Sequence, residues 1–208
     1  MSNVTTHESK DPTQLATFLH LAIEETNLSL EEHNWLWQNV QYEKIPFKKS
    51  IWYRKPGSKW IAYIAKGLVK KCVIQEKTGE EVILDFYEEN QFVLHLEDIS
   101  PNESIYYTTL EPTEILLWQI DYFHEMKDKT PRAAQWLLER TQEYAARQEK
   151  RIQILLLPTQ ERYLHFHTNS PKLVSKLSVR DTIAYLGFSR ALFFRLRQLH
   201  AKNLKKEE

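Results

Sequence analysis

The sequence predicts an α+β protein made of an antiparallel β-barrel or roll, one long helix and a group of short C-terminal helices. From residue 42 to residue 117, short runs rich in β-branched and aromatic residues alternate with turn signals such as Pro56-Gly57 and Thr78-Gly79. This alternation is typical of strands joined by hairpins. Apolar residues then recur at helical spacing from Pro131 until Pro158 ends the pattern. Shorter helical segments follow.

The individual elements can be placed from local signals. Residues 13–40 predict two short helices, the second of which begins near Ser29, with Glu31 and Glu32 in its first turn. The clearest strands are residues 60–65, 68–74, 81–86 and 114–120, and the C-terminal helices are residues 161–167, 179–185 and 189–201, before a charged tail at 202–208. We therefore divide the chain into residues 1–130 (β-roll with N-terminal helices), 131–157 (long helix) and 158–208 (C-terminal domain).

The long helix carries an apolar seam. Leu138, Ala145 and Ile152 recur every seven residues and Leu155 follows three residues later, whereas Thr141 and Gln148 interrupt the repeat. Such a seam fits packing inside its own domain as well as packing against a second copy of the helix.

Composition excludes several classes of protein. A single cysteine, Cys72, leaves no disulfide within the chain and no cysteine cluster for zinc or iron and sulfur, so we expect a reducing cytoplasmic compartment. Residues 1–12 do not resemble a signal peptide, and no run of 18 apolar residues could span a membrane. His165 and His167 lie two apart on a predicted helix and therefore face different sides. We expect no metal, no cofactor and no enzymatic activity, because no phosphate loop, nucleophile elbow or paired-carboxylate motif is present.

Charge is distributed unevenly although the formal net charge is zero. From Arg147 onward the chain has 13 Lys and Arg against 5 Asp and Glu, whereas the preceding part has 15 against 23. A basic C-terminal third beside an acidic body favours contact with a polyanion at one end, although chance segregation on a solvated surface gives the same pattern.

The segment 177–197 predicts a helix-turn-helix. Ser178 and Ser189 are suitable N-caps, and Gly187 supplies the left-handed backbone conformation that a tight turn between two helices needs. This arrangement places a second helix in the major groove of DNA, although an ordinary helical hairpin with solvated arginines has the same local signals. Phe193 and Leu196 are expected to face inward. The candidate DNA-binding residues are Arg180, Ser189, Arg190, Arg195 and Arg197, since the guanidinium group suits both guanine edges and phosphates.

Five segments in order resemble the Crp/Fnr family of regulators, and more specifically the divergent members found in Bacteroidetes. They are residues 63–69 (YIAKGLV), 78–82 (TGEEV), 90–93 (NQFV), 157–163 (LPTQERY) with Ser170-Pro171, and 183–189 (IAYLGFS) with 195–197 (RLR). The resemblance covers almost the whole chain. It implies a cyclic-nucleotide-binding-like β-roll, a long dimerisation helix that uses Leu138, Ala145, Ile152 and Leu155, and a winged-helix-like DNA-binding domain.

The sequence departs from the family in the DNA-binding region. Ala191 and Leu192 stand where Glu and Thr are usual, and Phe194 replaces a small or polar residue, so base preference should differ. Few residues follow the predicted recognition helix, so we expect a wing that is reduced or absent, with Lys202, Lys205 and Lys206 as alternative phosphate contacts.

The effector region also departs from the family. Residues 93–107 contain neither the glycine nor the arginine with which family members hold a cyclic nucleotide, so we do not expect cyclic AMP or cyclic GMP to bind in that manner. His95, Ser104, Tyr106 and Tyr107 are candidates for a pocket that takes another small molecule of unknown identity, but aromatic residues in a β-roll are also ordinary core.

These observations favour a cytoplasmic, homodimeric, sequence-specific transcription regulator that binds double-stranded DNA, with RNA polymerase as a further candidate partner. The alternative is a ligand-binding or protein-interaction module whose helix-turn-helix has lost DNA binding. Ala191, Leu192 and Phe194 favour that alternative, because apolar side chains on an exposed helix face can mark a partner surface.

Overall fold

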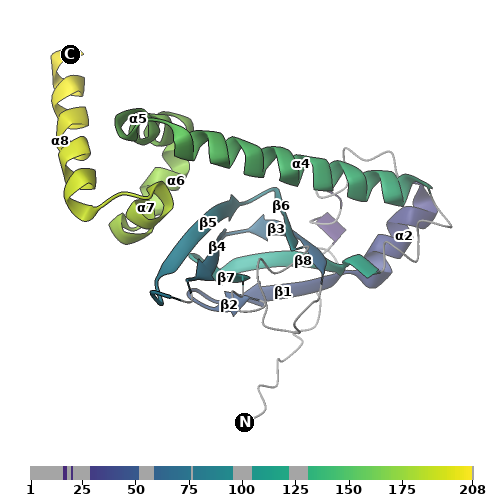
Figure 1. The fold of residues 1–208 in the computed structure, drawn as a ribbon. Coiled ribbons are helices and arrows are strands. Elements are labelled where there is room, and N and C mark those ends of the chain that lie inside the picture. The colour runs from purple at the N-terminus through teal and green to yellow at the C-terminus, as the bar shows by residue number, and fades with distance from the viewer. Residues whose placement is uncertain are drawn as a thin grey trace, which may run out of the picture.

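A computed structural model describes residues 16–17, 20, 29–51, 59–75, 77–95, 105–121 and 131–207 of the chain. Two antiparallel sheets lie below a long helix, and a cluster of short helices lies at one end (Figure 1). The predicted α+β class is therefore confirmed, with the strands forming two sheets rather than one closed barrel. The first of the two predicted N-terminal helices falls almost entirely outside the described residues.

The second N-terminal helix, α2 (Leu30–Asn39), begins where the sequence predicts. The Ser29 hydroxyl accepts a hydrogen bond from the Glu32 amide, and the Glu32 carboxylate accepts one from the Ser29 amide. This reciprocal capping box satisfies two amides that a helix start otherwise leaves without partners.

The described residues form eight strands in the two sheets. They are β1 (Gln41–Ile45), β2 (Ser50–Ile51), β3 (Trp60–Lys66), β4 (Leu68–Ile74), β5 (Glu81–Glu88), β6 (Gln91–His95), β7 (Ile105–Thr109) and β8 (Thr113–Gln119). One sheet has the order β1-β8-β3-β6 and the other β2-β7-β4-β5, and every described pairing is antiparallel. Most consecutive strands therefore change from one sheet to the other, as in a roll.

Alternation along the strands gives each sheet two buried faces. Trp60, Ala62 and Ile64 of β3 point between the sheets and join the interior core, whereas Ile61 and Tyr63 point to the outside. The outer face is covered by helices on both sheets, which explains why these strands are apolar on both sides.

The long helix α4 (Pro131–Leu156) and α2 cover the first sheet. Trp136 of α4, Leu36 of α2 and Trp118 of β8 belong to one buried cluster, and the Trp118 indole donates to the Leu36 carbonyl at 3.0 Å. Burial of these large rings fixes α4 along the roll.

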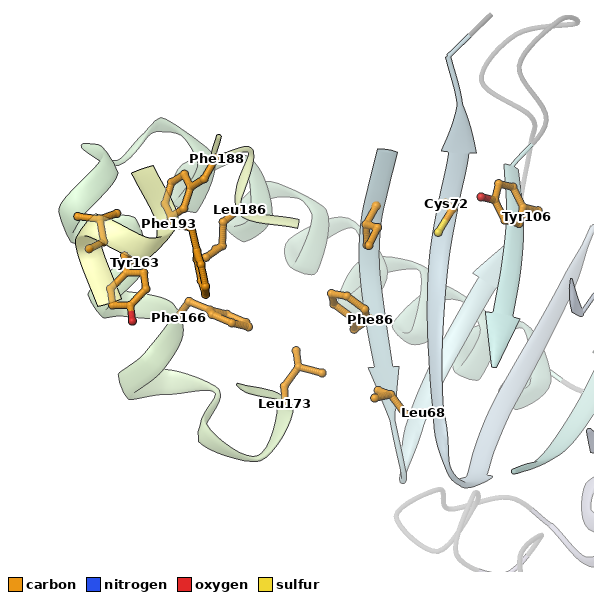
Figure 2. Packing of buried hydrophobic residues seen from close by; sticks show 12 residues of the cluster. Leu68, Cys72, Phe86, Tyr106, Tyr163, Phe166, Leu173, Leu186, Phe188 and Phe193 are labelled. Carbon is orange, nitrogen blue, oxygen red and sulfur yellow. The ribbon is translucent and has the colours of Figure 1, made fainter. Parts of the chain in front are cut away.

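The remaining helices pack together beside the second sheet (Figure 1). They are α5 (Thr159–Asn169), α6 (Pro171–Lys176), α7 (Val179–Leu186) and α8 (Arg190–Glu207). Figure 2 shows how Leu68, Cys72 and Phe86 on the strands face a group of aromatic and aliphatic side chains on the helices. The C-terminal helices therefore share a hydrophobic core with the roll.

Candidate nucleic-acid interface

The turn between α7 and α8 is built by the three residues that the sequence singles out. The Ser178 hydroxyl accepts from the Asp181 amide at 3.1 Å and caps α7. Gly187 ends α7 with φ of +67°, and the Ser189 hydroxyl accepts from the Leu192 amide at 3.3 Å at the start of α8. The predicted succession of a helix, a glycine turn and a second helix is therefore confirmed.

Two arginines from other helices hold the C-terminal end of α7. Arg162 of α5 donates from Nη1 to the Leu186 carbonyl at 2.9 Å and from Nη2 to the Leu157 carbonyl at 3.3 Å. Arg151 of α4 donates to the Tyr185 carbonyl, and its guanidinium carbon lies 3.6 Å from the centroid of the Tyr185 ring. Because terminal helix carbonyls lack partners within their own helix, these guanidinium groups fix the direction in which α7 ends.

The two faces of α8 differ in chemistry. Phe193 and Leu196 are buried against the other C-terminal helices, as predicted from their spacing. The five candidate DNA-binding residues all lie exposed: Arg180 on α7, Ser189 in the turn, and Arg190, Arg195 and Arg197 on α8. Figure 1 shows α8 on the far side of α7 from the sheets. The five candidate DNA-binding side chains are therefore exposed to solvent at one end of the molecule.

Charge on α8 is strongly positive. The helix contains six Arg and Lys residues and one acidic residue, Glu207. It extends to Glu207, beyond the end near residue 201 that the sequence predicts, and no strand follows it among the described residues. Lys and Arg are good helix formers, which suits a helix of this length.

A pair of histidines joins α5 to α8. The His167 ring lies against that of Tyr163, with centroids 4.2 Å apart and the planes tilted by 34°, and its centroid lies 5.7 Å from that of His200. Burial lowers the pKa of His167, and the nearby His200 and Arg197 lower it further. No sequence signal indicates this pair, because the two residues belong to different helices. Among the described residues, no three His, Cys, Asp or Glu side chains gather into a group that could hold a metal ion.

The seam of α4 faces solvent in the single chain. Leu138 is 50% exposed and Ile152 59% exposed, and Ala145 and Leu155 are also exposed. The seam therefore does not pack inside its own domain. A different stripe of α4, which includes Trp136 and Arg151, faces the roll and the C-terminal helices.

The candidate effector residues divide between two places. Tyr107 points between the sheets, where its ring meets Trp60 edge-on at 5.1 Å, and His95 stacks on the same Trp60 at 5.1 Å. Tyr106, the next residue in β7, points to the outside, where its hydroxyl donates to Glu81. The strand alternation therefore separates Tyr106 from His95 and Tyr107, and Ser104 lies outside the described residues.

A buried charge cluster connects the roll to α7. Lys70 of β4 is 8% exposed, and its Nζ lies 2.5 Å from Glu81 Oε1 and 3.4 Å from Asp181 Oδ1 of α7. Burial alone would lower the pKa of Lys70, but the hydrogen bond to Glu81 and the nearby negative charges raise it. Nearby, Nε of Arg147 on α4 lies 2.5 Å from Oδ2 of Asp85 on β5. Sequence reasoning missed this cluster, since only the fold brings its members together.

Comparison with known proteins supports the fold. The sequence matches no family model, and no curated protein matches it. Among solved structures, FixK2 from Bradyrhizobium japonicum superposes with a TM-score of 0.64 at 16% identity, over 79% of this chain and 86% of that one. A doubly substituted CooA from Carboxydothermus hydrogenoformans gives 0.64 at 14% identity, over 88% and 84%.

A third structure carries the family name. A protein from Eubacterium rectale that is assigned to the Crp/Fnr family of transcriptional regulators superposes with a TM-score of 0.63 at 12% identity, over 85% of each chain. The fold that the sequence resemblance implies is therefore confirmed: the chain has the fold of Crp/Fnr regulators, from the β-roll to the C-terminal helices. No helix within the described residues is long and apolar enough to cross a membrane.

Proposed function

We propose that the protein is a DNA-binding transcription regulator of the Crp/Fnr type. The observation that carries the proposal is a capped helix-turn-helix whose second helix buries Phe193 and Leu196 and exposes Arg190, Arg195 and Arg197. Guanidinium groups at the N-terminal end of such a helix can reach guanine edges, and those further along can neutralise phosphates. Similar structures include a global regulator from Xanthomonas campestris and the Eubacterium rectale regulator.

The active form is a homodimer that pairs two α4 helices along Leu138, Ala145, Ile152 and Leu155. In the assembled form of a protein, a surface helix rarely exposes a stripe of several large apolar residues to water. Two-fold pairing along α4 gives two copies of α8, which would meet half-sites about 34 Å apart on one face of the duplex.

Selection of DNA from a random pool at near-physiological salt tests this function. We expect wild-type protein to enrich an inverted repeat, and we expect Arg190→Ala and Arg195→Ala to lose that enrichment. Arg132→Ala is the matched control, because Arg132 is exposed on α4, away from the helix-turn-helix. Failure of the wild type to enrich any sequence would refute the proposal.

The β-roll does not bind cyclic AMP in this proposal. The Trp60 and His95 rings are stacked and the Tyr107 ring meets both of them edge-on, and residues 93–107 contain no glycine or arginine with which to hold a cyclic phosphate. We expect cyclic AMP to leave the melting temperature unchanged at concentrations where a bound ligand would raise it. A concentration-dependent rise would overturn this part of the proposal.

A protein-interaction module is the second candidate, because Phe194 and Leu199 are exposed on α8. Salt dependence separates the two functions. Phosphate contacts release counterions, so DNA affinity should fall by about tenfold or more between about 50 and 200 mM salt. Binding that depends on apolar packing against a protein would not weaken in this way.

A further inference from the structure

The first two turns of α8 present an apolar surface beside a cation. Phe193 and Leu196 face the core of the C-terminal domain, so Ala191 and Phe194 lie on the outward side of the helix. The Phe194 side chain is 37% exposed, whereas the neighbouring Phe193 is buried. The exposed ring is therefore on the face that the proposed function directs into the major groove.

Phe194 is paired with Arg190. The two residues are one helical turn apart, and the Arg190 guanidinium carbon lies 5.8 Å from the centroid of the Phe194 ring. A cation over an aromatic face at this distance is attracted by the electrons of the ring. The ring therefore limits the directions in which the Arg190 guanidinium can point, and places an apolar surface next to it.

The groups that the bases expose in the major groove indicate what such a pair of side chains can bind. Guanine offers the paired acceptors O6 and N7 to a guanidinium, and the methyl group of thymine is the apolar group on the edges of the four standard bases. We propose that Arg190 and Phe194 read two neighbouring base pairs together: Arg190 binds a guanine, and the Phe194 ring packs on the methyl group of an adjacent thymine. This inference rests on the proposed DNA binding and assigns Phe194 as a specificity-determining residue.

Replacement of thymine by uracil tests the inference, because it removes one methyl group and leaves base pairing intact. The probe is the duplex enriched by wild-type protein, resynthesised with deoxyuridine at one thymine at a time. The guanine that Arg190 reads is the one whose replacement weakens binding by the wild type but not by Arg190→Ala. At a thymine next to this guanine, we expect uracil to weaken wild-type binding about fourfold, which is the effect of losing one buried methyl group.

Two variants complete the experiment. Phe194→Ala should bind the thymine and uracil duplexes equally, and Phe194→Leu, which keeps an apolar side chain, should retain part of the difference. Leu199→Ala is the matched control, because Leu199 is a second exposed apolar residue on α8, more than a turn beyond Phe194, and its uracil sensitivity should equal that of wild type. Circular dichroism of each variant checks the helix content.

The outcomes separate this inference from the proposed function. A wild-type protein that binds its selected duplex but tolerates uracil at every position would overturn the inference and leave DNA binding intact. Equal uracil sensitivity in wild type and Phe194→Ala would do the same, since the methyl group would then be read by another residue. Absence of any selected duplex would refute both.

Discussion

Arg162 shows how one side chain sets the geometry of the helix-turn-helix. It donates to the carbonyl of Leu186, at the end of α7, and to that of Leu157, which directly follows α4. We expect Arg162→Ala to lower the free energy of unfolding by about 2 kcal/mol, because both carbonyls lose a charged donor. Urea denaturation followed by circular dichroism measures this change.

Two further variants make the measurement specific. Arg162→Lys keeps the charge but offers a single compact ammonium group in place of a fork, so its stability should lie between those of wild type and Arg162→Ala. Arg132→Ala, which alters an exposed arginine on α4, should unfold at the same urea concentration as wild type. Equal midpoints for Arg162→Ala and wild type would show that the two hydrogen bonds contribute nothing.

Capping residues are the part of the site that the sequence predicts best. Ser178, Gly187 and Ser189 act within four residues of their own positions, so local rules suffice for them. Arg162 contacts a carbonyl 24 residues away, and Lys70 reaches Asp181 across 111 residues. No periodicity or motif encodes such pairings, because they arise only after the helices have packed.

At the scale of elements, the contact between α5 and α8 should depend on pH. The pKa of His167 lies below its ordinary value of 6.5 in the folded protein because burial, His200 and Arg197 disfavour the imidazolium form. The unfolded chain therefore takes up this proton at higher pH than the folded one. The stabilisation is complete above the ordinary pKa, and it is lost as the pH falls from there through the lower folded value.

The matched variants isolate this contribution. We expect the urea midpoint of wild type to fall between about pH 7.5 and about pH 5.5, and we expect a smaller fall in His167→Gln, which cannot be protonated. His165 lies two residues away, on a different side of α5, so His165→Gln should retain the wild-type fall. A pH dependence identical in wild type and His167→Gln would contradict this assignment.

Among the elements, the short helix α6 (Pro171–Lys176) and the length of α8 differ from the sequence prediction. Ser170 and Pro171 predict a turn, but proline is well tolerated at the first position of a helix, since the amide there has no partner within the helix. Long elements with strong periodicity, such as α4 and β3 to β5, agree with prediction because many residues contribute to the pattern.

At the scale of the whole molecule, the exposed seam of α4 predicts the oligomeric state. We expect Ile152→Glu to raise the dimer dissociation constant about 100-fold, because two carboxylates would face each other without partners across the symmetric seam. Sedimentation velocity over a concentration series measures it. Gln153→Glu adds the same charge one position away, outside the seam, and should leave the dimer intact; a monomeric wild type would contradict the dimer altogether.

How the C-terminal helices dock on the roll could not be predicted from sequence. The roll and the helix-turn-helix each have a recognisable sequence pattern. In the sequence, Leu68, Phe86 and Tyr106 are ordinary strand residues. Only the structure shows that they share one buried cluster with Phe166 and Leu186 of the helices (Figure 2). Docking depends on the match of two surfaces, which no single segment encodes.

Lys70 makes this docking dependent on charge. Its ammonium group is the buried cation between Glu81 of the roll and Asp181 of α7. We expect Lys70→Met to lower the free energy of unfolding by about 2 kcal/mol, because removal of the cation leaves two partly buried carboxylates next to each other without their common partner. Addition of Glu81→Gln should recover part of the loss, since it removes one of those carboxylates. If Lys70→Met unfolds at the wild-type urea concentration, or if Glu81→Gln adds a full independent loss, the charges do not act together, and the apolar cluster alone holds the helix-turn-helix against the roll.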